Sequence, residues 1–164
     1  MIARDAFVSR FGGVYEHSPF IAERAYDQGL VHEPLTATGV ADALATVFQE
    51  APEDERLGVL RAHPDLAGKL AIAGGLTEES RREQAGAGLD RLSPEEHAEF
   101  TELNSAYIDK FNFPFIIAVS GLNKDDILSA FRRRIDSSEA VELETACAEV
   151  EKIAGLRLRN MLAE

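Results

Sequence analysis

The stretch SPEEHAEFTELNSAYIDKF, residues 93–111, followed directly by NFPFIIAV, residues 112–119, decides the fold of this chain. A serine, a proline in the first turn and two glutamates form a capping box that starts a helix to about Lys110. Apolar, aromatic and β-branched residues then fill positions 113–119, which favours an extended conformation there. No second convincing strand is written elsewhere in the sequence to pair with this segment. The sequence therefore predicts a helical protein with one short extended segment.

Helix-start signals recur outward from this stretch in both directions. The predicted helices begin at Ser18-Pro19, Thr38, Pro52, Thr77, Asn123 and Ser138. The helix from Ser18-Pro19 is closed by Gly29, and the helix from Ser138 is the longest, running to about Met161. We find no internal repeat and no linker-like stretch. We therefore expect an all-α, bundle-like single domain over residues 1–164, with roughly seven or eight helices.

Composition and charge exclude several classes of protein. The chain has 164 residues and a net charge of −12, which repels phosphate backbones and makes nucleic-acid binding a poor hypothesis. No run of apolar residues is long enough to span a membrane, and the first residues lack the apolar core of a signal peptide. The single cysteine, Cys147, can form neither an internal disulfide nor a multi-cysteine metal site. These features predict a cytoplasmic protein with no membrane or nucleic-acid partner.

Two places in the sequence carry candidate polar groups. His63 follows a predicted helix and is held extended by Pro64, so it is either a general acid–base group or a structural histidine at a helix end. Ser80, Glu83 and Gln84 share one helix face, because they stand at i, i+3 and i+4. That face either binds a small polar ring or is an ordinary solvated surface.

Two further features leave alternatives open. The backbone of residues 113–119 needs hydrogen-bond partners, which either nearby side chains and water or a ligand supply. Arg157 lies within the apolar stripe of the last helix, which favours burial of its guanidinium. Its partner is then a structural carboxylate or a ligand carboxylate, unless the side chain reaches the surface. By contrast, Arg132-Arg133-Arg134 is typical of a solvated helix face.

The same residues carry a resemblance to a known family. The chain resembles 2-oxo-4-hydroxy-4-carboxy-5-ureidoimidazoline (OHCU) decarboxylases of urate degradation. The matching stretches are YEHSPFIAERAY (15–26), AHPDLAGK (62–69), LTEESRREQAGAGLDRLSPEE (76–96), LNSAYIDKFNFPFIIAVSG (103–121) and EVEKIAGLRL (149–158). Together they cover the chain nearly from end to end.

The resemblance implies an all-helical domain, a homodimer, and decarboxylation of OHCU to (S)-allantoin without a metal or other cofactor. It places the catalytic residues on His63 and Glu83. The substrate-binding residues it implies are Pro64, Ser80, Glu83, Gln84, Phe115, Ile116, Ile117, Ala118, Val119 and Arg157. On this interpretation His63 transfers a proton, Glu83 tunes and orients it, and Arg157 binds an anionic or carbonyl group. The alternatives are a catalytically silent helical binding domain and a lyase acting on a related ureido compound.

Overall fold

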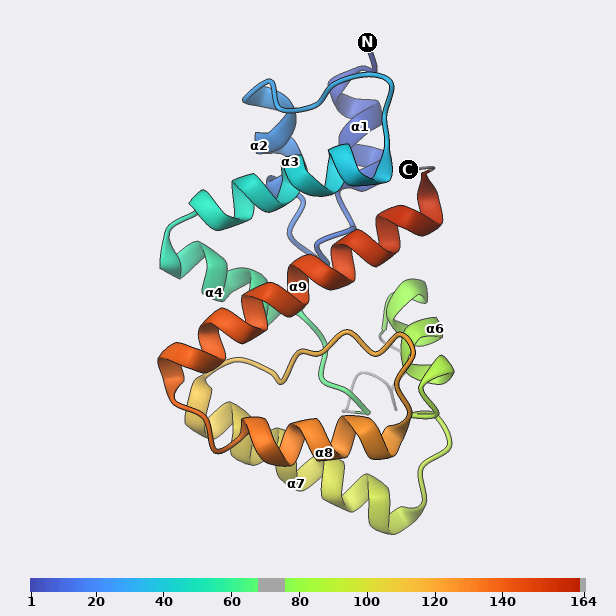
Figure 1. Cartoon of the computed structure of the whole chain (residues 1–164), viewed down its shortest axis with the longest axis vertical. Coiled ribbons are helices and arrows are strands. Elements are labelled where there is room, and N and C mark those ends of the chain that lie inside the picture. Colours follow the sequence, from blue (N-terminus) through green and yellow to red (C-terminus); the bar gives the residue numbers. More distant parts are fainter. Residues whose placement is uncertain (68–75, 163–164) are drawn as a thin grey trace. The chain divides into compact units, whose positions relative to one another are not determined.

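The computed structural model describes residues 1–67 and 76–162, and every regular element within them is a helix (Figure 1). There are eight helices in this part of the chain, which confirms the predicted all-α fold. Gly68 and Lys69, which end one of the stretches that carry the resemblance, lie outside the described residues. No described helix is long and apolar enough to cross a bilayer.

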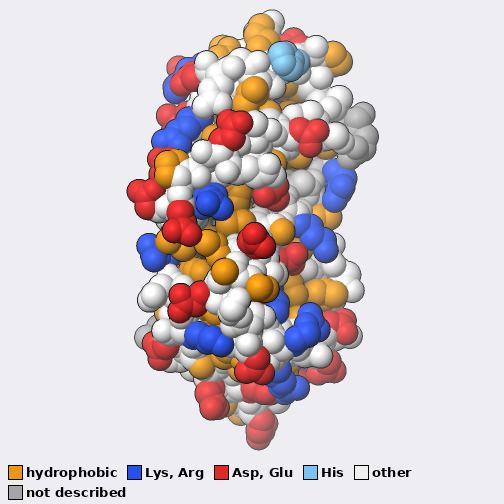
Figure 2. All heavy atoms as spheres, turned by 60° about the vertical axis from the view of Figure 1, so that its left-hand side comes forward, with side chains coloured by type: hydrophobic (Ala, Val, Ile, Leu, Met, Phe, Trp, Pro, Cys, Tyr) orange, Lys and Arg blue, Asp and Glu red, His pale blue; other side chains and the backbone are white. Residues whose placement is uncertain are grey.

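The chain divides into two compact units. The first unit consists of residues Met1–Ala62 together with the chain from Val150 onward, and the second consists of His63–Glu149. On the face shown in Figure 2, acidic side chains are interspersed with basic ones, as the net charge of −12 and the 17 lysines and arginines lead one to expect.

The first unit is a helical cluster around aromatic side chains. It contains α1 (Arg4–Phe11), α2 (Phe20–Asp27), α3 (Ala37–Glu50), α4 (Glu53–Ala62) and the C-terminal part of α9 (Glu139–Met161). Both α1 and α3 contact α2. The ring centroids of Phe7 and Phe11 lie 5.0 Å apart, and those of Tyr15 and Phe48 lie 5.4 Å apart. All four of these side chains are buried, so they form the core of this unit.

The start of the first unit differs from the sequence prediction. Helix α1 was not predicted, because its eight residues carry no capping side chain at Ala3. Helix α2 begins at Phe20, and Pro19 is the flanking residue rather than the first helical one. Ser18 does not cap it with its side chain; instead, its carbonyl accepts a hydrogen bond from the Ile21 amide, one turn ahead. Gly29, with φ of +73°, follows the end of this helix as predicted.

The second unit contains α6 (Glu78–Gly86), α7 (Pro94–Phe111), α8 (Lys124–Arg134) and the start of α9. The predicted caps are confirmed, because Thr77 accepts from the Ser80 amide and both Ser93 and Asn123 form complete capping boxes. The core surrounds the buried ring of Tyr107, and the rings packed against it belong to Phe111, Phe113, Phe115 and Phe131. Residues 114–119 form neither helix nor strand, as the lack of a partner strand predicts.

Candidate functional site

His63 lies at the first position after α4, and its side chain is only 8% exposed. Pro64 disfavours helical geometry at the preceding residue, which is why α4 ends at Ala62. The following turn, residues 65–67, ends with Ala67 in the left-handed region at φ of +52°. A non-glycine residue adopts that conformation only when its surroundings hold it there.

Two amide side chains hold this turn. Gln84 accepts a hydrogen bond from the Ala67 amide at 2.9 Å and donates one to the Asp65 carbonyl at 3.2 Å. Asn104, on α7, donates to the Leu66 carbonyl at 2.9 Å. Both amide side chains are buried. The backbone that follows His63 is therefore fixed from two helices, and Asn104 is a residue that the sequence analysis missed.

The predicted polar face of α6 points inward at two of its three positions. Ser80 and Gln84 are buried and Glu83 is half-buried, so the solvated-face alternative is wrong for Ser80 and Gln84. These two hydrogen bonds of Gln84 occupy one of its two amide hydrogens and part of its oxygen's capacity. Gln84 thus holds the turn and retains hydrogen-bonding capacity for a ligand.

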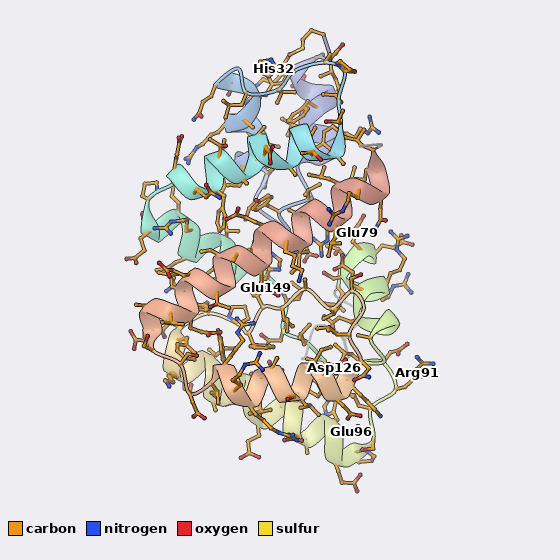
Figure 3. The ribbon with its side chains drawn as sticks, in the orientation of Figure 1. His32, Glu79, Arg91, Glu96, Asp126 and Glu149 are labelled. Atoms are coloured by element: carbon orange, nitrogen blue, oxygen red, sulfur yellow. The ribbon has the colours of Figure 1, made fainter. Side chains whose placement is uncertain are left out.

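The extended segment is held largely by side chains of its own unit. Arg134 donates to the Ile116 carbonyl at 2.7 Å, and the Ala118 amide donates at 2.9 Å to Glu149, which is labelled in Figure 3. The Val119 carbonyl accepts from the Leu122 amide at 3.0 Å. Ile117 is half-buried, and its backbone N–H and C=O make no hydrogen bond within residues 1–67 and 76–162. The side-chain account of this segment is therefore correct for the Ile116 carbonyl and the Ala118 amide, while Ile117 keeps a donor and an acceptor available to a ligand.

A buried ionic cluster supports the segment, and the sequence analysis misassigned its arginine. The Glu142 carboxylate accepts from Arg134 at 2.6 Å and from the Tyr107 hydroxyl at 2.6 Å. Arg134 is 7% exposed, so the prediction of a solvated face is wrong for this member of the arginine run. The signal was present, because Arg134 continues the apolar positions Ile127 and Phe131 at helical spacing. Arg157 occupies the corresponding kind of position on the apolar stripe of α9.

Arg157 belongs to the first unit, whereas the other predicted site residues, His63, Pro64, Ser80, Glu83, Gln84 and residues 115–119, belong to the second. Its guanidinium lies 2.7 Å from the Glu16 carboxylate and 3.3 Å from the Val14 carbonyl. The Arg157 and Glu16 side chains are 6% and 2% exposed, which excludes the alternative of an arginine reaching the surface. A carboxylate of the protein itself faces this arginine.

Burial alters the acidity of two groups beside these clusters. Desolvation raises the pKa of Asp65, which directly follows Pro64. Desolvation, followed by the hydrogen bond to Glu142, raises the pKa of the Tyr107 hydroxyl well above its ordinary value. Tyr107 therefore stays protonated and donates its hydrogen bond across the whole physiological pH range.

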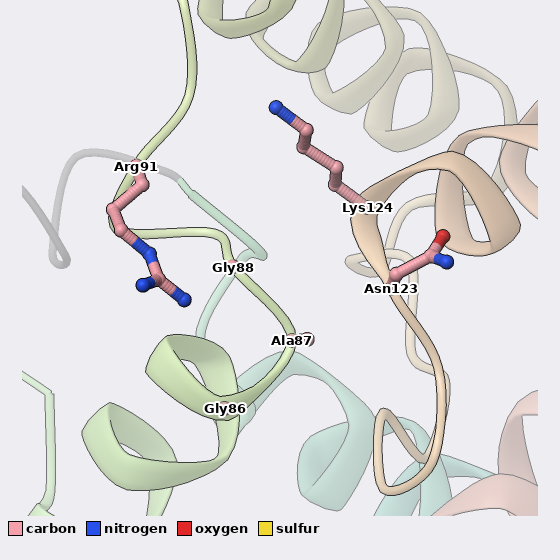
Figure 4. A pocket seen from close by; sticks show the side chains of 6 residues that line it. All are labelled: Gly86, Ala87, Gly88, Arg91, Asn123 and Lys124. Carbon is pink, nitrogen blue, oxygen red and sulfur yellow. The ribbon is translucent and has the colours of Figure 1, made fainter.

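The second unit also contains an open cavity of about 340 Å³ at the end of α6. Figure 4 shows Gly86, Ala87, Gly88 and Arg91 on one side of it and Asn123 and Lys124 on the other. Lys124 lies 2.8 Å from Glu96, which is labelled with Arg91 in Figure 3. Within the described residues, no group of three or more histidine, cysteine or carboxylate side chains is placed to hold a metal ion.

Comparison with known proteins finds similarity over nearly the whole chain. The sequence profile described as OHCU decarboxylase matches residues 1–159. A relative from Halalkalicoccus jeotgali, named 2-oxo-4-hydroxy-4-carboxy-5-ureidoimidazoline decarboxylase, is 42% identical over 96% of this chain and 86% of its own length. A relative of the same name from Bos taurus is 39% identical over 96% of this chain and 91% of its own length.

Two crystal structures share the fold. One, of (S)-allantoin synthase, superposes with a TM-score of 0.77 at 28% identity, covering 98% of this chain and 51% of that one. This chain thus spans about half of that protein. The other, of OHCU decarboxylase in the presence of (S)-allantoin, superposes with a TM-score of 0.69 at 26% identity, covering 87% of this chain and 89% of that one.

Proposed function

Since the chain belongs to the OHCU decarboxylase family, with the family profile matched over residues 1–159, we propose that it decarboxylates OHCU to (S)-allantoin and CO2. The observation that carries this proposal is that the buried His63, the inward positions of α6 and the open backbone of Ile117 all belong to one compact unit. Such a set includes a proton-transfer group as well as donors and acceptors for a small polar ring.

The reaction defines what these groups have to do. The bond between the ring carbon and the carboxylate breaks, and its electron pair moves onto the ring carbon and toward the adjacent imine. The hydroxyl on that carbon loses its proton as a ring carbonyl forms, and a proton is added to one face of the neighbouring carbon that bears the ureido group. The proton released from the hydroxyl and the proton added to carbon cancel, so the one net proton that each decarboxylation consumes goes to the ring nitrogen of the former imine. The enzyme must therefore hold the carboxylate out of the ring plane and protonate from one side.

We assign the proton transfer to His63, because histidine is the commonest general acid or base and the turn at residues 65–67, which follows His63, is held in place. Glu83 orients and tunes it. Pro64, Ser80, Gln84 and the backbone of residues 115–119 contact the ring and the ureido arm, with Ile117 supplying both a donor and an acceptor. Arg157 binds an anionic or carbonyl group of the substrate.

The test is the rate of OHCU loss, with OHCU generated in situ from urate by urate oxidase and hydroxyisourate hydrolase. The wild-type protein should accelerate this loss over the spontaneous decay. His63→Ala and His63→Gln should each remove about 10²–10⁴-fold of the acceleration while the helical content is kept. His32→Ala is the matched control, because His32 is exposed in the first unit (Figure 3). A fully active His63→Ala variant would exclude the acid–base role.

We also propose that the protein is a homodimer, which the family resemblance supports. A cytoplasmic location is supported by the single cysteine, the buried Cys147. Light scattering coupled to size-exclusion chromatography would test the dimer, and a monomer at all concentrations would contradict it. Fractionation of the producing cells would test the location.

A further inference from the structure

An extended segment without a partner strand has no ladder to set its register. A shift of one residue along such a segment exchanges the side chains that face inward with those that face outward. In residues 113–119 the shift would also move the open backbone groups of Ile117 away from the place where a substrate meets them. Side chains outside the segment must therefore fix the register of residues 113–119 relative to the helices of the same unit.

The Arg134 guanidinium touches two consecutive residues of the segment in two different ways. Its terminal nitrogen donates to the Ile116 carbonyl at 2.7 Å. Its face lies over the Phe115 ring, with the guanidinium carbon 4.4 Å from the ring centroid. The same ring stacks on Phe131, with centroids 3.9 Å apart and planes 7° from parallel. The segment is thus held at a carbonyl and at a side chain at once.

The guanidinium itself is held by a second pair of groups. Its Nε donates to the Glu142 carboxylate at 2.6 Å, and the Tyr107 hydroxyl donates to the same oxygen at 2.6 Å. Glu142 is fully buried and Tyr107 is fully buried, on α9 and α7 respectively. A planar group with directed donors on its edge and an aromatic ring against its face has one orientation, which a lysine cannot reproduce.

We propose that Arg134, Glu142 and Tyr107 are positioning residues that set the register of residues 113–119 and so aim the Ile117 backbone at the substrate. A buried ion pair is weak as a source of stability, and one carboxylate oxygen of Glu142 has no hydrogen-bond partner within the described residues. The directed contacts of the Arg134 guanidinium nevertheless select one arrangement of the segment among several. The cluster is best explained by this need for one arrangement. The inference rests on the proposed function, because the substrate is what the register serves.

The test compares Arg134→Lys with Arg132→Lys. Both changes lie on α8, both keep a positive charge, and both remove an arginine bound to a glutamate, since Arg132 lies 2.8 Å from Glu99. Arg132 is exposed and its hydrogen bonds within the described residues go to Glu99 rather than to the segment, so its variant should retain kcat/KM to within about twofold. Arg134→Lys should lose about 10–100-fold in kcat/KM per folded molecule, as expected for misplacement of a substrate-binding group.

The enantiomeric excess of the allantoin separates positioning from mere stability. A misaligned segment should let protonation occur on both faces, so the excess should fall in Arg134→Lys and stay at the wild-type value in Arg132→Lys. An Arg134→Lys variant that melts at a lower temperature but keeps wild-type kcat/KM and enantiomeric excess would overturn the proposal. If Arg134→Lys does not fold, Tyr107→Phe takes its place, and its kcat/KM and enantiomeric excess are measured. Both should fall by less than is expected for Arg134→Lys, and wild-type values of both would overturn the proposal.

Hydrogen exchange keeps this inference separate from the proposed function. The Ala118 amide is bonded to Glu149 only while the segment keeps its register. In the absence of substrate, that amide should exchange faster in Arg134→Lys than in Arg132→Lys. Equal exchange would overturn the positioning role, even if the wild-type protein decarboxylates OHCU. A wild-type protein that does not accelerate OHCU loss would overturn the proposed function, whatever the exchange rates.

Discussion

Replacing Arg157 by methionine should destabilise the protein strongly, because the change removes the guanidinium that faces the buried Glu16 carboxylate at 2.7 Å. Breaking a buried ion pair by removing one partner costs about 3–5 kcal/mol. For a chain of this size, each kcal/mol lowers Tm by roughly 2–4 °C, so the expected drop is about 6–20 °C. Calorimetry or thermal circular dichroism measures it. An unchanged Tm would refute this account of the pair.

A second variant separates stability from substrate binding. Arg157→Met combined with Glu16→Leu replaces the whole pair by apolar groups, which is often neutral or stabilising and should restore most of the lost Tm. If Arg157 also binds the substrate, the double variant should be stable and yet show a KM for OHCU raised by about 10–100-fold, the worth of a hydrogen bond to a charged group. A stable double variant with the wild-type KM would refute the binding role and leave Arg157 as a structural residue.

Three further outcomes are expected. Asn104→Ala should lower the free energy of unfolding by about 1–3 kcal/mol in urea titration, because the buried Leu66 carbonyl loses its donor. The hydrogen bond with Lys124, and to a smaller extent the one with the Ser93 amide, lowers the pKa of Glu96 below its ordinary value of 4.5. The ionised Glu96 therefore contributes its full stabilisation of the fold above pH 4.5, and this contribution is lost as the pH falls through the lowered pKa. The difference in urea midpoint between wild type and Glu96→Gln should therefore close on acidification. Burial raises the pKa of Asp65 above its ordinary value of 3.8, so the ionised carboxylate lowers the stability of the folded protein above pH 3.8. Asp65→Asn should therefore raise the urea midpoint at neutral pH, and this difference from the wild type should disappear below pH 3.8.

Local signals in the sequence predicted most of the helices, because the start of a helix depends on the capping residue and the few residues that follow it. The capping boxes at Ser93 and Asn123 and the cap at Thr77 occur where the sequence placed them. Helix α1 was missed since its start has no side-chain cap, and Ser18 was misread since its carbonyl, not its hydroxyl, is used at the start of α2. In both cases packing determines the boundary.

The candidate site was less predictable, because the partner of a polar side chain depends on which distant element packs beside it. Helical spacing indicated that Gln84 shares a face with Ser80, but nothing in the sequence indicated that it would hold the turn at residues 65–67. Arg134 lies 18 residues from Ile116, so the local sequence does not identify this contact, although the position of Arg134 on the apolar stripe of α8 indicates burial. A charged residue on an apolar stripe is therefore a useful signal for buried networks.

The handedness of the product tests the central claim most directly. OHCU decays by itself to racemic allantoin, so allantoin formation alone carries no information about the protein. The measurement is circular dichroism of the allantoin formed from OHCU with and without the protein. The account predicts rapid appearance of an (S)-allantoin signal with the wild-type protein and its loss with His63→Ala. An optically silent product that forms no faster than in the control without protein would contradict it.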